Sequence, residues 1–130
     1  MKKNIFLFLF LVVLGSCGNS APAPGDVAGQ TARQYYDYLL HGDVEAYVAG
    51  MDMPDTIPPV YREQLVTNAR MFLEQQQQEH RGIREVRFAS AKADTARRVA
   101  QVFLTLAYGD STKEDIVVPM IWRKGVWYMR

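Results

Sequence analysis

The apolar residues of this 130-residue chain change their spacing once, and this change limits the folds that the chain can adopt. From residue 26 to residue 80 they recur every three or four positions, which is the period of a helix with one buried face. From residue 86 onward they alternate with polar or small residues, which is the period of a half-buried strand. Helices that precede a group of strands favour an α+β fold.

Three helices are predicted in the first part of the chain. Asp26 is a suitable N-cap for the first helix, which runs over residues 26–41. Gly42 suits the left-handed position after that helix, and Asp43 can cap a second, short helix. A proline-containing loop then leads to the third helix, over residues 60–80.

The second part of the chain predicts a meander of four strands. Turn residues separate the strands at 93–95, 109–111 and 124–125. The simplest packing lays the N-terminal helices on one face of a curved four-stranded antiparallel sheet. Pro119 falls within the third strand and has no N–H to donate. It therefore requires either an edge position or a β-bulge, and the pattern leaves both open.

The first 16 residues are typical of an export signal. Lys2 and Lys3 precede an unbroken apolar run over residues 5–14. This run is too short to span a membrane, which takes about 20 apolar residues, but it suits the apolar region of a signal peptide. We therefore predict that residues 1–16 form a signal peptide.

The only cysteine follows this run directly. Leu14, Gly15, Ser16 and Cys17 have the order aliphatic, small, small, cysteine, and this pattern resembles the bacterial lipobox. The resemblance implies that the chain is cut before Cys17 and that lipid is attached to this residue. A thiolate is the nucleophile that such an alkylation needs. Several acyl chains hold a protein stably on a membrane, whereas one chain binds only marginally.

The residues after the cysteine indicate where the domain lies. Residues 17–25 are small or polar and contain proline, so we expect a flexible tether that precedes a domain over residues 26–130. Gly18, Asn19 and Ser20 stand where some bacterial lipoproteins carry acidic surface-export signals. We therefore expect a lipid-anchored protein of the cell envelope, in the outer membrane and facing the periplasm.

The composition argues against metal, cofactor and nucleic-acid chemistry. Fifteen Lys and Arg residues against fourteen Asp and Glu residues give a net charge of +1, which predicts no basic surface for nucleic acid. Lipidation of Cys17 leaves no thiol for a disulfide or a metal site. His41 and His80 are too far apart in the sequence to form a metal-ligand motif. We expect no metal and no cofactor.

Two segments combine helix-capping and turn residues in a pattern that resembles a known family. The first is a helix, a turn and the start of a second helix, with the sequence Tyr36-x-x-Leu39-x-x-Gly42-Asp43-x-Glu45-Ala46. The second is the last alternating strand, which leads through Lys124-Gly125 to Trp127. Together they resemble the nuclear-transport-factor-like, or cystatin-like, domain of small bacterial lipoproteins of unknown function. The resemblance covers about residues 26–130 and implies helices packed on a curved sheet.

Four residues are candidates for a functional site. Tyr35 lies on the inward stripe of the first helix, where it can line a pocket or serve as a core aromatic. Trp122 and Trp127 flank one turn, where they can form a platform for a peptide or sugar or pin the hairpin to the helices. The alternative is a small enzyme that uses Tyr35 or Asp37 as an acid–base group between helices and sheet, as enzymes of the resembled fold do.

No nucleophile–base pair or phosphate-binding loop accompanies these residues, so we expect a non-enzymatic module. Its expected partners are the membrane, through lipidated Cys17, and an envelope protein or a small ligand. Val99 and Phe103 make the second face of the sheet partly apolar. Because related domains often dimerise through their sheet, a homodimer is also expected to be possible.

Overall fold

The computed structural model describes residues 23–130, so the predicted signal peptide, Cys17 and most of the predicted tether lie outside the described residues. The described elements are α2 (Pro24–Leu40), α3 (Val44–Ala49), α4 (Pro59–His80), β1 (Ile83–Asp94), β2 (Val99–Tyr108), β3 (Lys113–Arg123) and β4 (Val126–Met129). The strands form one antiparallel sheet in the order β1-β2-β3-β4. The predicted α+β fold, with N-terminal helices on a four-stranded meander, is confirmed.

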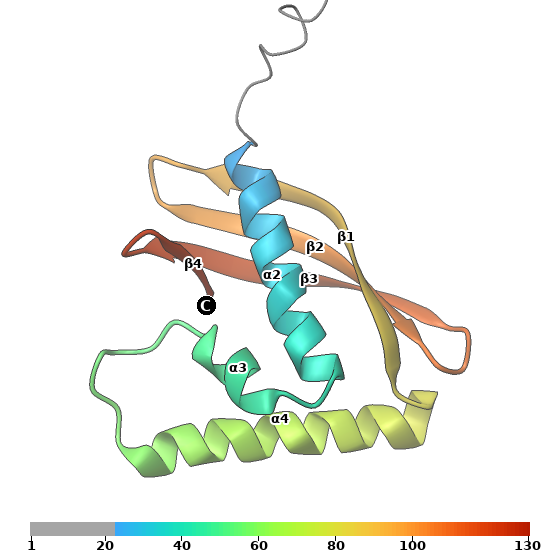
Figure 1. Ribbon diagram of the computed structural model, residues 1–130. Coiled ribbons are helices and arrows are strands. Elements are labelled where there is room, and N and C mark those ends of the chain that lie inside the picture. The colour runs from blue at the N-terminus through green and yellow to red at the C-terminus, as the bar shows by residue number, and fades with distance from the viewer. Residues whose placement is uncertain (1–22) are drawn as a thin grey trace, which may run out of the picture.

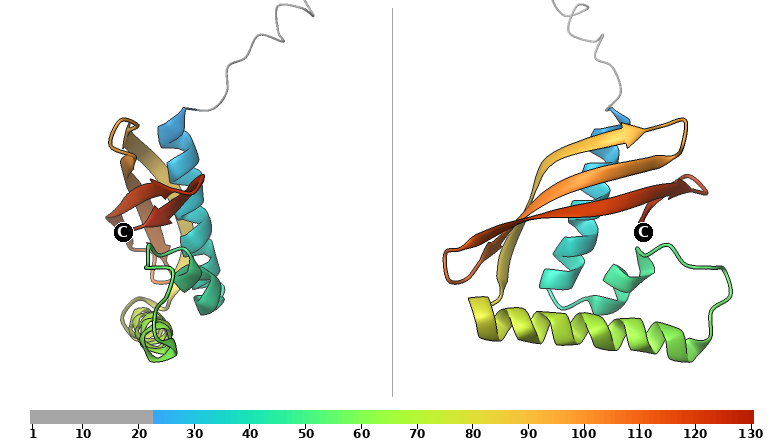
Figure 2. Two further views of the ribbon diagram at one scale, coloured as in Figure 1. Left: turned by 90° about the vertical axis from the view of Figure 1, so that its left-hand side faces the viewer. Right: turned by 180° about the vertical axis from the view of Figure 1, so that it is seen from behind.

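The helices lie on one side of the sheet. In Figure 1, α2 crosses the face of β1 and β2, and α4 crosses beyond the C-terminal end of α2. Seen edge-on in Figure 2, α2 and α3 lie on the same side of the sheet, and no helix of residues 23–130 covers the opposite face. The N-terminal end of α2 and the long helix α4 therefore mark opposite ends of the domain.

The first helix begins two residues earlier than predicted. Ala23 is the N-cap and makes no side-chain cap hydrogen bond, and Pro24 occupies the first turn. The prediction that Asp26 is the N-cap is therefore wrong. Proline at this position loses no helical hydrogen bond and already has a helical φ. Asp26 lies in the first turn, where its charge is favourable at the positive end of the helix dipole.

The turns that follow α2 and α4 use left-handed residues. Gly42 has φ +85°, and Asp43 Oδ1 accepts a hydrogen bond of 3.3 Å from the Ala46 N–H, so both predicted roles are confirmed. After α4, Arg81 and Gly82 have φ values of +60° and +85°. Two consecutive left-handed residues turn the chain sharply into β1.

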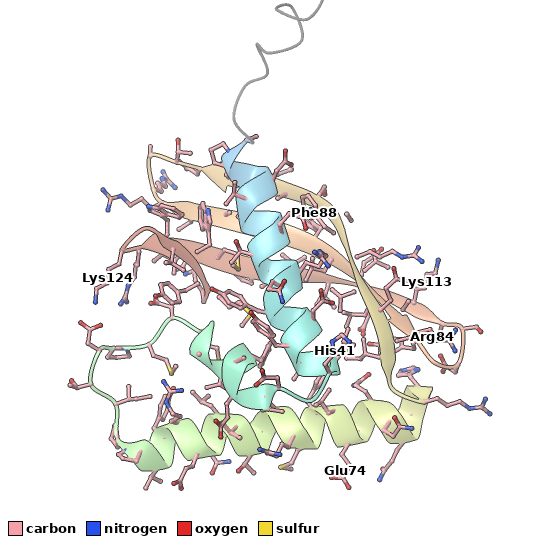
Figure 3. All side chains as sticks on the ribbon, viewed as in Figure 1. His41, Glu74, Arg84, Phe88, Lys113 and Lys124 are labelled. Atoms are coloured by element: carbon pink, nitrogen blue, oxygen red, sulfur yellow. The ribbon has the colours of Figure 1, made fainter. Side chains whose placement is uncertain are left out.

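The principal core lies between α2 and the inward face of β2. Five alternating residues of that strand are buried, namely Ala100, Val102, Leu104, Leu106 and Tyr108. In its first half, α2 turns small residues toward the sheet, namely Ala28, Gly29 and Ala32, and all three are buried. Gly29 lies directly against the Phe88 ring, beside α2 in Figure 3. Small side chains on the helix therefore let its backbone approach the sheet closely.

Pro119 occupies an edge position, which decides between the two alternatives that the sequence left open. It pairs with Gln101 of β2 without a register shift, so there is no bulge. Its C=O accepts from the Arg130 N–H at 2.9 Å, and the ladder with β4 ends at Met120 and Met129. The N and C=O of one strand residue point to the same side. The missing N–H of Pro119 therefore faces Arg130, just beyond the last pair of the β4 ladder, so the proline removes no bond of that ladder.

The β2–β3 hairpin holds the C-terminal end of α4. The Gly109 N–H donates to Gly82 O at 2.9 Å, and the Asp110 N–H donates to His80 O at 3.0 Å. The Asp110 carboxylate lies 3.0 Å from His80 Nδ1. Hydrogen bonds from Thr112 and His80 lower the pKa of Asp110 to about 2. The carboxylate is therefore charged over the whole physiological range and fixes the hairpin to the helix.

Candidate binding site at the tryptophan hairpin

Trp122 and Trp127 face each other across the β3–β4 hairpin, on the helix side of the sheet. They form a direct cross-strand pair, and their ring centroids lie 5.4 Å apart with an interplanar angle of 64°. Lys124 and Gly125 have φ values of +52° and +78°, the geometry of a tight two-residue hairpin turn. This turn sets the register that brings the two indoles together. Trp127 is buried, and Trp122 is half-buried.

An open cavity of about 550 Å³ lies against the two indoles. Three separate segments form it: the first turn of α2, the β1–β2 turn and the β3–β4 hairpin. The lining residues are Pro24, Val27, Thr95, Arg98, Trp122, Lys124, Gly125 and Trp127. The backbone N–H of Trp122 donates to Arg98 O at 2.8 Å, which fixes the β1–β2 turn to the hairpin. The cavity is mainly apolar, and its polar groups are cationic or hydroxyl.

Carboxylates from the loop before α4 neutralise part of this positive charge. Lys124 Nζ lies 2.9 Å from Asp55 Oδ1, and Arg123 Nη1 lies 2.6 Å from Asp52 Oδ1. The hydrogen bond from Lys124 lowers the pKa of Asp55. Arg98, in contrast, has no carboxylate partner among residues 23–130. The site therefore offers indole surface beside one free guanidinium and one exposed ammonium group, which suits a ligand with apolar and anionic parts.

Tyr35 does not line this cavity, but it holds the hairpin that carries the two indoles. Its O–H donates to Trp127 O at 2.7 Å, and its ring packs against Gly50. Burial raises the pKa of Tyr35, and the neighbouring hydroxyls of Tyr128 and Tyr38 raise it further. The phenol therefore stays protonated at neutral pH and acts as a fixed hydrogen-bond donor.

Asp37 lies apart from the cavity. It forms an ion pair of 2.8 Å with Arg33, one helical turn earlier on α2. The structure thus places Tyr35, Trp122 and Trp127 around one hairpin and leaves Asp37 on a different face of the helix. Sequence reasoning missed Arg98 and Thr95, because only the folded sheet brings the β1–β2 turn next to the β3–β4 turn.

A second, smaller cavity lies between the helices and the free edge of β3, with a volume of about 270 Å³. Tyr36 and Tyr47 line it, with ring centroids 5.5 Å apart at 81°. Burial is the main cause that raises the pKa of each phenol. The sequence feature that indicates their proximity is the Gly42 turn, which joins the two helices that carry them.

Comparisons with known proteins identify the fold. No protein-family model matches this sequence, and no curated protein matches it. A solved structure from Campylobacter jejuni, provisionally named an NTF2-like transpeptidase, is similar with a TM-score of 0.61 and 9% identity, over 75% of this chain and 92% of that one. A SEC-C motif-containing protein from Rhodopseudomonas palustris is similar with a TM-score of 0.52 and 15% identity, over 78% of this chain and 76% of that one.

At these identities the likeness shows the fold alone. The chain therefore has the nuclear-transport-factor-like (NTF2-like) fold, as the family resemblance implied. No helix within residues 23–130 is long and apolar enough to cross a membrane. Within the same residues, no three His, Cys, Asp or Glu side chains are arranged to hold a metal ion.

Proposed function

We propose that this protein is an envelope lipoprotein, anchored by lipidated Cys17 in the outer membrane and facing the periplasm, that binds a ligand without transforming it. The tryptophan cavity is its binding site. The observation that carries the proposal is the pairing of Trp122 and Trp127 beside an uncommitted Arg98 guanidinium. Indole faces and a guanidinium together recognise partly apolar, anionic groups, which occur in both small ligands and proteins.

The charge states of the candidate acid–base groups support binding over catalysis. The Tyr35 hydroxyl already donates to Trp127 O, and Asp37 is paired with Arg33. Tyr36 and Tyr47 have raised pKa values, so at neutral pH they remain protonated and cannot accept a proton. They can donate hydrogen bonds to a ligand in the smaller cavity. A general base, in contrast, must be deprotonated near neutral pH, which these phenols are not.

The anchor is tested by replacing residues 1–17 with an ordinary cleavable signal peptide. We expect the exported domain to move from the outer-membrane fraction to the soluble periplasmic fraction, because only the acyl chains hold it. Circular dichroism of the two forms should agree. The matched control is Ser16→Ala, which keeps a small residue before Cys17 and should keep the protein in the membrane. Retention of the replaced form in the membrane would contradict the lipid anchor.

The binding site is tested by a photoreactive amino acid in place of Trp122. We expect it to crosslink an envelope component in living cells, and mass spectrometry of the product identifies that component. The control position is Glu74, which is exposed on α4, away from both the tryptophan cavity and the uncovered sheet face (Figure 3). Equal crosslinking from both positions would show that the tryptophan cavity is not the binding site.

We also propose that two copies pair through the sheet face that the helices leave uncovered. Phe103 pairs with Val117 on this face, and Val99 pairs with Ile121, so two apolar pairs flank Gln101 and Pro119. Val117 is 53% exposed. We expect Val117→Glu to convert a dimer into a monomer in size-exclusion chromatography with light scattering, because it places a charge in an apolar interface. Val60→Glu, on the exposed side of α4, is the control, and a monomeric parent protein would refute the pairing.

A further inference from the structure

The tryptophan cavity lies at the end of the domain where the chain arrives from Cys17. Pro24 and Val27, in the first turn of α2, form part of its lining. Seven residue steps separate Cys17 from Pro24, and a fully extended chain covers at most about 3.6 Å per step, or about 25 Å in total. Figure 1 shows α4 at the other end of α2. If Cys17 carries lipid, as the proposed function requires, the cavity lies next to the membrane.

The exposed chemistry of this end matches the headgroup layer of a membrane. Tryptophan is favoured at membrane–water interfaces, where its ring is partly apolar and its N–H can be hydrated. Val27 is 40% exposed at the cavity rim and adds apolar surface. Arg98 has no carboxylate partner among residues 23–130, and Lys124 shares its ammonium group only with the exposed Asp55. Guanidinium and ammonium groups both bind phosphate oxygens well.

Charge alone does not distinguish this end of the sheet from the opposite end, which also carries cations (Figure 3). Lys124 lies at the hairpin end, whereas Arg84 and Lys113 lie at the far end of the sheet (Figure 3). Asp26, beside Val27, is the carboxylate in this turn of α2, and its negative charge repels an anionic partner. The attraction is therefore modest and needs the anchor to make it effective, since tethering raises the local concentration of the lipid surface.

We propose that the tryptophan cavity docks on anionic phospholipid headgroups of the same membrane that holds Cys17. A headgroup phosphate lies between Arg98 and Lys124, and Trp122 enters the interfacial layer. The anchor and the cavity then form a two-point attachment. This attachment holds α4 and the free edge of β3 toward the solvent side, where the smaller cavity remains open to other ligands.

Intrinsic fluorescence tests this docking directly, because the two tryptophans of the chain both line the cavity. The full lipoprotein is reconstituted into vesicles whose lipids carry bromine atoms near the headgroup, which quench nearby indoles. We expect stronger quenching in phosphatidylglycerol–phosphatidylcholine vesicles than in pure phosphatidylcholine. Arg98→Gln with Lys124→Gln should abolish that difference. Arg84→Gln with Lys113→Gln removes the same charge at the far end and should leave it unchanged.

A second arm separates the docking from the anchor. The buried apolar residues of the described chain all lie between Ala28 and Met129, so a chain that begins at Gly18 contains that whole core. We expect this unlipidated chain to bind phosphatidylglycerol vesicles weakly, with roughly tenfold lower affinity when both cavity cations are removed. If the anchor proposal fails but this binding occurs, the affinity of the cavity for anionic headgroups still stands, and only the two-point attachment is lost.

Three results would overturn the docking. One is quenching of the lipidated protein that does not depend on headgroup charge. The second is an equal loss in the far-end control variant. The third is a fluorescence change with inorganic phosphate that vesicles do not reproduce, which would assign the cavity to a free anion.

Discussion

Gly109→Ala is expected to destabilise the protein by about 2–4 kcal/mol. A Cβ at this position would overlap the backbone oxygen of Arg81 and lie 2.9 Å from the Arg81 Cβ. A backbone oxygen cannot rotate away as a side chain can. The hairpin would have to move off α4, which would break the hydrogen bonds that Gly82 O and His80 O accept.

Urea unfolding followed by circular dichroism measures this effect. The matched control is Gly25→Ala, because its Cβ would lie 3.5 Å from Ala91 O, an ordinary van der Waals distance. We expect that control to change the free energy of unfolding by less than about 1 kcal/mol, since alanine is the better helix former. If the two variants were equally stable, the close approach of the hairpin to the α4–β1 turn would be absent in solution.

The sequence predicted those parts of the fold that depend on local pattern. The single change of period separated the helices from the strands, and Gly42 and Asp43 marked a turn by their own conformational preferences. Asp26 failed as the predicted N-cap because Pro24 could start the helix earlier, and a side-chain cap was then unnecessary. Pro119 required an edge or a β-bulge, and only the register with β2 and the length of β4 decide between them.

The candidate site was predictable only in part, for a related reason. Trp122 and Trp127 could be paired because a two-residue turn fixes their register locally. Arg98 reaches the same cavity through the β1–β2 turn, and Val27 reaches it through α2, so their proximity depends on how the sheet packs against the helix. The hydrogen bond from Tyr35 to Trp127 O spans 92 positions of sequence, and no local pattern predicts it.

Gly50→Ala is the second substitution expected to have a large effect, about 2–3 kcal/mol. The backbone of Gly50 has φ −80° and ψ −3°, which alanine adopts readily, so the cost is steric. Its Cβ would lie 2.6 Å from Tyr35 Cδ1 and 2.7 Å from Tyr35 Cγ. Neither the Gly50 backbone nor the Tyr35 ring can move away easily. Gly50 O accepts from the Met129 N–H, and the Tyr35 hydroxyl is held by Trp127 O.

A double-mutant cycle with Tyr35→Ala shows whether this contact is the cause. Removal of the ring alone should cost about 2–4 kcal/mol, but it also makes room for the new Cβ. We therefore expect the double variant to be more stable than the sum of the two single changes predicts, by about 1 kcal/mol or more. Additive losses would mean that Gly50 is required for another reason.

The same cycle bears on what Tyr35 does in the protein. Tyr35→Phe keeps the ring and removes only the hydrogen bond to Trp127 O, so we expect a loss of about 1 kcal/mol and a shift in tryptophan fluorescence. Because the hydroxyl positions the hairpin that carries both indoles, this variant should weaken ligand binding at the cavity moderately and leave Cys17 anchoring unchanged. Abolition of a chemical activity by Tyr35→Phe, with stability and fluorescence intact, would instead favour the enzyme alternative. Tyr35→Phe therefore distinguishes the two functions. If Tyr35 supports the hairpin, the substitution alters the indole site, and if Tyr35 is a catalyst, the substitution alters turnover alone.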